Sequence, residues 1–115
     1  MKEHEKLVVW QKAMDLVVEV YRLCNGLPGH EEFALTGQIR RSVVSIPANI
    51  AEGSARRTRK EFLQYPYMAR TSLAELETHL GIARRVGYFT SLPGAITSLL
   101  TEVGRLLNSF ITSLK

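Results

Sequence analysis

The sequence has few of the residues from which disulfides, metal sites and membrane spans are built. It contains one cysteine and three histidines among 115 residues, so no intrachain disulfide can form. Cys24 falls within a helical apolar pattern, which is typical of a small core residue. No stretch approaches the roughly 18 apolar residues of a membrane span. The charged start, residues 2–6, is not followed by an apolar block with a cleavage site. We expect a soluble, cytoplasmic protein.

Recognised metal-binding and phosphate-binding patterns are also missing. A di-iron site in a helical bundle needs two Glu-x-x-His pairs, and no histidine here has a glutamate three residues before it. Glu75 and His79 lie one turn apart but supply only two ligands, so neither a metal nor another cofactor is expected. The sequence has no Gly-x-Ser-x-Gly elbow and no Gly-x-x-x-x-Gly-Lys phosphate loop.

Small helical ribonucleases, which pair an arginine with a histidine a few residues further along, are the nearest enzyme class. Seven residues separate Arg22 from His30, and eight separate Arg70 from His79. Both spacings are too long for that pattern. We therefore expect no catalytic residues, and a weak nuclease remains an alternative that an RNA-cleavage assay can test.

What the chain does have is a helical apolar period throughout. The hydrophobic fraction is 45%, which argues against disorder, and apolar residues recur at spacings of three and four. Short connections between long helices favour antiparallel neighbours. The sequence predicts an all-α, up-down-up-down antiparallel four-helix bundle, one domain of residues 1–115. Its helices are expected at about residues 7–25, 31–52, 59–87 and 92–114.

Several residues give the expected helix ends and irregularities. Thr58 with Glu61 reads as a capping box, and Ser91 as a cap with Pro93 in the first helical turn. Pro47 lies inside the second expected helix and Pro66 inside the third. Because a proline removes one backbone donor and clashes with the preceding turn, we expect a kink at each.

The first helix is apolar over more of its circumference than one core can cover. Its apolar arc spans roughly 220°, whereas a helix with one buried face needs little more than about 100°. We expect the surplus face to meet another subunit, and hence a homo-oligomer.

The positive charge is concentrated in one segment. Residues 40–60 carry six basic residues and one acidic residue, whereas the other 94 residues carry nine basic and ten acidic. Such asymmetry favours binding to a polyanion, recognised by shape and charge. The candidate nucleic-acid-binding residues are Arg40, Arg41, Arg56, Arg57, Arg59 and Lys60. The competing interpretation is that these side chains cap helices and pair with nearby glutamates.

Three segments resemble the four-helix-bundle proteins encoded in 23S ribosomal RNA intervening sequences. They are residues 9–16 (VWQKAMDL), residues 35–53 (LTGQIRRSVVSIPANIAEG) and residues 72–78 (SLAELET). The resemblance implies a bacterial four-helix bundle that forms a homopentamer and has no established enzymatic activity. It also implies kinship with the accessory protein of diversity-generating retroelements, a basic pentameric barrel thought to bind nucleic acid.

The second segment carries the family's strongest motif, and this chain departs from the family at one position. Besides Arg40 and Arg41, the matching residues are Ser45, Pro47, Asn49, Glu52 and Gly53. On the expected helix, Ser45, Asn49 and Glu52 share a face with Arg41, which favours a polar network that braces the Pro47 kink. Pro66 stands where an ordinary helix former is expected.

These observations lead to two main hypotheses about function. The first is a non-enzymatic homo-oligomer that binds RNA or DNA through its basic surface, with no membrane partner. The second is a protein–protein scaffold whose basic rim takes an acidic partner protein.

Overall fold

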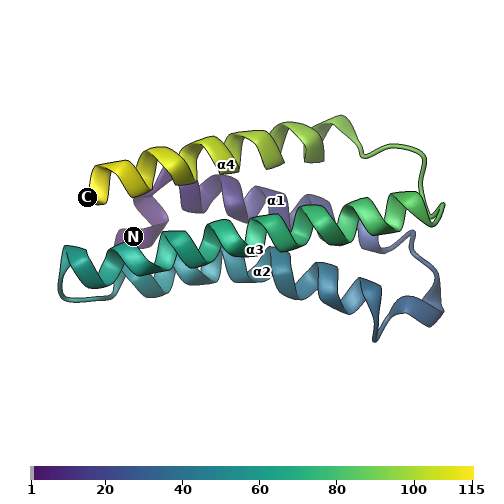
Figure 1. Ribbon diagram of the computed structural model, residues 1–115, viewed down its shortest axis with the longest axis horizontal. Helices are drawn as coiled ribbons and strands as arrows, with labels where there is room; N and C mark the ends of the chain where they lie inside the picture. The colour runs from purple at the N-terminus through teal and green to yellow at the C-terminus, as the bar shows by residue number, and fades with distance from the viewer. Residues whose placement is uncertain (1) are drawn as a thin grey trace.

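The structure, a computed structural model, describes residues 2–115, so Met1 of the expected domain lies outside the described residues. Four long helices lie side by side as a bundle (Figure 1), which confirms the predicted fold class. Short 3-10 helices precede the first and second of them, at Glu3–Lys6 and Gly29–Glu31. The four are α1 (Val8–Cys24), α2 (Leu35–Ser54), α3 (Arg59–Arg85) and α4 (Gly94–Leu114).

The helices follow one another around the bundle, each antiparallel to the next. α1 packs against α2 and α4, and α3 packs against the same two helices. Both ends of the chain and the short α2–α3 turn lie at one end of the bundle, and the other two loops lie at the opposite end (Figure 1). The up-down-up-down order therefore gathers the α2–α3 turn and the two chain ends at one pole.

Apolar residues at helical spacing form one continuous core between the four helices. α1 contributes residues such as Leu16 and Val20, and each of the other helices adds a similar stripe. Leu16, Ile46, Leu76 and Leu107 are fully buried. Burial of such a side chain contributes about 1.5–3 kcal/mol, so these stripes are the main source of stability.

Two helix starts differ from the sequence-based expectation. α2 begins at Leu35 rather than near Glu31, because residues 29–31 form a separate 3-10 turn. α4 begins at Gly94, so the prediction that Ser91 caps a helix containing Pro93 was wrong. Pro93 itself is the N-cap, with an extended backbone at φ −55° and ψ 143°. An extended residue at that position cannot belong to the first helical turn.

The predicted start of the third helix at residue 59 is confirmed, and the helix ends two residues before its predicted end at about residue 87. Thr58 caps α3, with its side chain accepting a hydrogen bond from the Glu61 backbone N–H at 3.1 Å. α3 ends at Arg85, and Gly87 then adopts a positive φ of 93°. Glycine tolerates this left-handed conformation, which stops the helix.

Neither internal proline ends its helix. Pro47 lies within α2 and Pro66 within α3, and both are buried. Figure 1 shows α2 and α3 as unbroken helices along the bundle. Each proline still lacks the backbone N–H that would donate to the carbonyl four residues earlier. The local bend expected at each proline remains a prediction.

The structure also bears on membrane insertion. Within residues 2–115, no helix is both long and apolar enough to span a bilayer.

Candidate nucleic-acid interface

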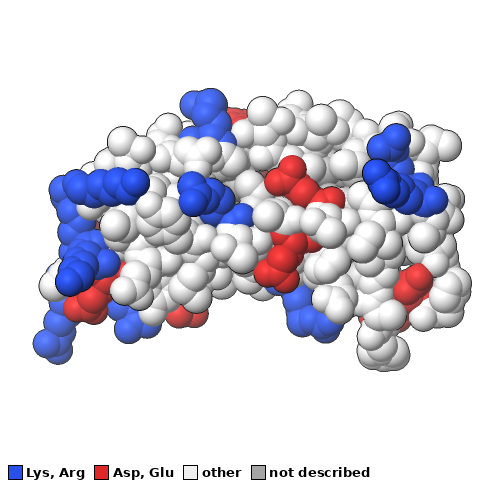
Figure 2. All heavy atoms as spheres, viewed as in Figure 1, with Lys and Arg blue, Asp and Glu red and all other residues white. Residues whose placement is uncertain are grey.

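Four of the six candidate cations meet at the α2–α3 turn. We call this group the basic turn: Arg56, Arg57, Arg59 and Lys60, all exposed. Figure 2 shows basic side chains gathered at this end of the bundle. Arg56 approaches Glu52 at 4.0 Å, with its side chain 44% exposed. Within residues 2–115, the other three have no carboxylate within 4.0 Å.

Helix dipoles act on the two halves of the basic turn in opposite directions. Arg56 and Arg57 follow the carboxyl end of α2, where a cation is favourable. Arg59 and Lys60 occupy the first two positions of α3, where the partial positive charge of the helix end repels them. A helix-capping role therefore explains the first pair of cations but not the second.

The structure separates Arg40 and Arg41 from the basic turn. Helical rise puts Arg40 roughly 24 Å from Arg56 along the bundle. Arg40 is occupied: it donates to Glu32 at 2.7 Å, and its side chain is only 26% exposed. That hydrogen bond raises the pKa of the Arg40 guanidinium. The six cations thus form two groups, and Arg40 is the one held closely by a carboxylate, whereas Arg41 is exposed and has none within 4.0 Å among residues 2–115.

Arg41 lines an open groove between α1 and α2. The groove holds about 400 Å³ and has an apolar floor with two arginines beside it; its lining residues are Tyr21, Arg40, Arg41, Val44, Ser45 and Ala48. The Arg40 guanidinium also lies 5.5 Å from the Tyr21 ring centroid. The family-motif arginines therefore border an apolar groove rather than the basic turn.

The remaining motif residues act within α2 or at its contact with α3. Ser45 donates to the Ser42 carbonyl at 2.9 Å, and Asn49 donates to the Ser45 carbonyl at 2.8 Å. These bonds go to the backbone of α2 and not from one motif side chain to another, so they do not form the expected network. Gly53 is buried against α3, where an added Cβ would lie 2.7 Å from the Tyr65 Cβ.

Aromatic and basic residues that sequence reasoning missed lie beside the basic turn. Arg56 Cζ lies 4.9 Å from the Tyr65 ring centroid, and Arg70 Cζ lies 4.9 Å from that of Tyr67. The Lys115 ammonium is 6.0 Å from the Tyr67 ring. Tyr67 and Arg70 are three apart on one helix, a spacing that could have revealed their contact. Arg56 and Tyr65 meet only because the turn folds back.

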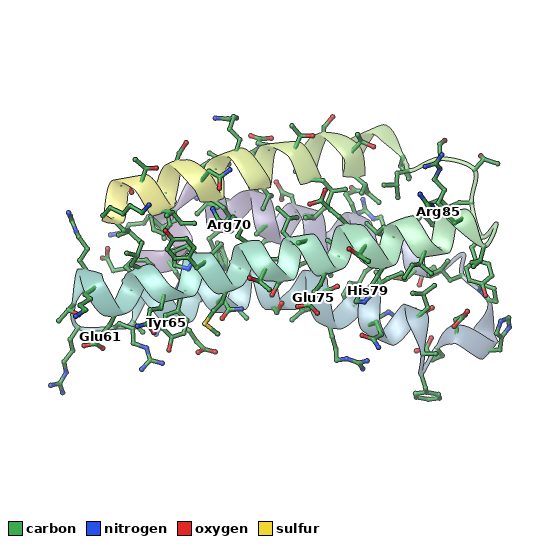
Figure 3. All side chains as sticks on the ribbon, viewed as in Figure 1. Glu61, Tyr65, Arg70, Glu75, His79 and Arg85 are labelled. Carbon is green, nitrogen blue, oxygen red and sulfur yellow. The ribbon has the colours of Figure 1, made fainter. Side chains whose placement is uncertain are left out.

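Residues 2–115 contain no group of three or more His, Cys, Asp or Glu side chains that could hold a metal ion. Glu75 and His79 lie one turn apart on α3 (Figure 3), and the buried Nδ1 of His79 has no hydrogen-bond partner.

Burial raises the pKa of the Cys24 thiol, although Arg40 beside it acts in the opposite direction. A raised pKa keeps the thiol protonated, the form that is a poor nucleophile.

Comparisons with known proteins agree with this architecture. A family model described as 23S rRNA-intervening sequence protein matches residues 5–109. The chain is also similar to the crystal structure of a protein with unknown function from the S23 ribosomal protein family of Bacteroides thetaiotaomicron. The two are 31% identical, with 90% of this chain and 98% of that chain covered and a TM-score of 0.77. A search of curated proteins gives no match.

Proposed function

Because the chain belongs to the 23S rRNA-intervening sequence protein family, we propose that it is a self-associating helical bundle, without enzymatic activity, that binds RNA through the basic turn. The family name refers to intervening sequences of 23S ribosomal RNA. RNA is a polyanion that is present in the cytoplasm. The similar solved protein is itself of unknown function. The proposal therefore depends on the chemistry of this chain's own surface.

One observation carries the RNA-binding proposal: within residues 2–115, three of the four exposed cations of the basic turn have no carboxylate within 4.0 Å. Arg57, Arg59 and Lys60 pair with none, and two of them sit where the α3 dipole disfavours positive charge. An arrangement that lowers the stability of the free protein becomes favourable when phosphates neutralise the cations. Such contacts fix a protein on a phosphate backbone without reading its sequence.

Salt-dependent binding of mixed-sequence RNA tests this proposal. We expect affinity to fall steeply between low and moderate salt, because bound cations release counterions. The test variant replaces all four basic-turn residues by alanine: Arg56, Arg57, Arg59 and Lys60. It should bind far more weakly and lower the slope of log affinity against log salt by roughly three.

A matched control removes the same charge from elsewhere on the surface. It replaces four exposed arginines outside the basic turn by alanine: Arg22, Arg84, Arg85 and Arg105. Equal losses in both variants would mean that only net charge matters, and the proposed site would be wrong. Absence of binding at low salt, or recovery of an acidic protein partner without RNA, would favour the scaffold hypothesis instead.

The self-association part of the proposal is supported by exposed apolar residues on the outer sides of α1 and α2. We call this surface the α1–α2 face: Met14, Val18, Tyr21, Val44 and Ala48. Val18 is 48% exposed, and Tyr21 and Val44 are each 41% exposed. Contiguous apolar surface of this kind marks interaction sites. We expect light scattering to give a mass several times 12.9 kDa; the pentamer remains an expectation from the family resemblance.

A further inference from the structure

Two arginine–tyrosine pairs flank the first half of α3, next to the basic turn. Arg56 lies over Tyr65, and Arg70 lies over Tyr67, each at 4.9 Å from the ring centroid. Tyr65 lies on the side of α3 that faces α2, whereas Arg70 lies on the side that faces α4 (Figure 3). The tyrosine rings are half-buried and both arginines are exposed. The pairs therefore lie on either flank of the same stretch of helix.

Contacts with neighbouring helices hold both pairs in place. The absence of a side chain at Gly53 lets Tyr65 pack directly against α2, since an added Cβ would lie 2.7 Å from the Tyr65 Cβ. On the other flank, Arg70 donates to Asn108 Oδ1 of α4 at 3.1 Å. Each guanidinium thus has fewer accessible conformations than a free surface arginine, which reduces the entropy that a ligand contact must overcome.

The chemistry of these pairs suits a nucleobase better than a phosphate alone. A guanidinium stacked on an aromatic ring is planar, and its outer face can take another planar group. Unpaired bases stack on arginine planes and aromatic rings, whereas bases inside a duplex are covered by their neighbours. A second flat group on each arginine would complete a stack of tyrosine, guanidinium and base.

We propose that the ligand of this surface is single-stranded RNA, with bases stacked on Arg56 and Arg70 and phosphates on the basic turn. This inference rests on the proposed RNA binding and specifies its substrate class. Helical rise places Arg70 about 17 Å from the start of α3. The next charged residues along α3 are Glu75 and Glu77, both exposed, and Figure 2 shows acidic side chains in the middle of the molecule. Repulsion from these carboxylates ends the RNA path near Arg70.

The sharpest test separates stacking from charge. A double variant, Arg56→Lys with Arg70→Lys, keeps both positive charges but removes both planar groups. Three probes are compared at one salt concentration: a single strand of about 16 nucleotides, the same strand with abasic sugars, and a duplex of equal phosphate number. We expect the wild-type protein to prefer the intact single strand. The variant should bind that strand about tenfold more weakly or worse and bind the other two unchanged.

Two further variants serve as control and as independent check. Arg84→Lys with Arg85→Lys makes the same chemical change at two exposed arginines outside the proposed surface, and it should leave binding of all three probes unchanged. Tyr65→Leu with Tyr67→Leu removes the rings that hold the arginines and should reproduce the loss for the intact strand. Circular dichroism and thermal unfolding establish that each variant is folded, and the surface lysine substitutions keep the test valid if the leucine variant is not.

The outcomes distinguish this inference from the function on which it rests. Equal binding of intact and abasic strands, with no effect of the Arg56 and Arg70 substitutions, would overturn base stacking and leave the basic turn as a phosphate site. Preference for the duplex would also overturn it. Failure to bind any of the three probes at low salt would overturn both proposals.

Discussion

Gly53 is the residue at which the two most closely packed helices depend on a missing side chain. A Cβ added at Gly53 would lie 2.7 Å from Phe62 Cδ1 and 2.7 Å from Tyr65 Cβ, so only a hydrogen fits there. The sequence predicts that the second helix ends at about residue 52, whereas the structure keeps Gly53 inside α2. The difference arises because close approach to α3, and not backbone conformation, requires a glycine here.

We predict that Gly53→Ala destabilises the protein by about 1–2 kcal/mol, since overpacking outweighs the gain in helix propensity. Gly81→Ala is the matched control on α3, because an added Cβ there meets nothing within 4 Å. That substitution should stabilise the protein by about 0.5–1 kcal/mol. Urea unfolding measures both, and a stabilising Gly53→Ala would show that the α2–α3 contact is looser than described.

A tyrosine–glutamate hydrogen bond joins the two loops at the pole opposite the basic turn. Tyr88 donates from its hydroxyl to Glu31, whose other oxygen accepts from the Leu35 backbone N–H. The bond from Tyr88 holds the pKa of Glu31 below its ordinary value of 4.5, and the same bond raises the pKa of Tyr88 above 10.0. Both shifts favour the state in which Glu31 is charged and Tyr88 is neutral.

We predict that Tyr88→Phe lowers the melting temperature at neutral pH, with a difference from wild type that depends on pH. The Glu31 pKa is depressed by folding, so its contribution is present above the ordinary pKa and is lost as pH falls through the folded value. The Tyr88 pKa is raised, so its contribution is lost as pH rises through the folded value, above 10.0. Thermal unfolding from pH 3 to 9 measures the difference in melting temperature between the wild type and the variant. This difference should be constant down to about pH 4.5 and should narrow below it. A difference that is unchanged at pH 3 would contradict this assignment.

At the scale of elements, the start of α3 matters most for the candidate site, because Arg59 and Lys60 are its first two residues. Thr58 sets this start by accepting from the Glu61 N–H. We predict that Thr58→Ala costs about 1 kcal/mol and frays the first turn of α3. Urea unfolding gives the stability and hydrogen exchange of residues 59–62 gives the fraying, with Thr58→Ser as the cap-preserving control. Unchanged exchange would mean that packing alone fixes the turn.

Helix periodicity made the four elements predictable, but it could not place every boundary. Thr58 predicts the start of α3 correctly, because its hydroxyl can accept a hydrogen bond from a backbone N–H of the first helical turn. Ser91 has the same chemistry, yet α4 starts after it because Pro93 is held in an extended conformation. Residues 29–31 likewise take a tighter helical turn ahead of α2. The starts of α2 and α4 depend on how the loops before them pack at the end of the bundle opposite the α2–α3 turn, and the local sequence does not encode this packing.

At the scale of the whole molecule, the sequence indicated the basic segment but not its division. Arg40 and Arg56 belong to one charged segment of sequence, yet helix α2 holds them far apart. Glu32 neutralises Arg40 across a loop, a contact that depends on tertiary structure. The Arg56–Tyr65 pair depends on it too, since Arg56 reaches Tyr65 only after the chain reverses at the turn. Charge counts identify a segment, and the fold decides which of its charges remain free.

Self-association belongs to this scale as well. We predict that Val18→Glu with Val44→Glu lowers the mass in solution toward 12.9 kDa, because two charges would have to be buried on the α1–α2 face. Val86→Glu is the control: its side chain is 58% exposed but lies beyond the end of α3, away from that face. Light scattering measures the masses. An unchanged mass for the double variant would place the contact between copies on another surface.

An even number of antiparallel helices returns both chain ends to the pole that carries the α2–α3 turn (Figure 1). A purification tag fused to either end would therefore lie close to the basic turn and would distort measurements of RNA affinity. A fluorescent reporter inserted between Thr90 and Ser91, both exposed, would project from the opposite end of the bundle and leave the basic turn unobstructed. The same proximity makes a circular permutant feasible, with the present ends joined by a short linker and new ends opened between Thr90 and Ser91.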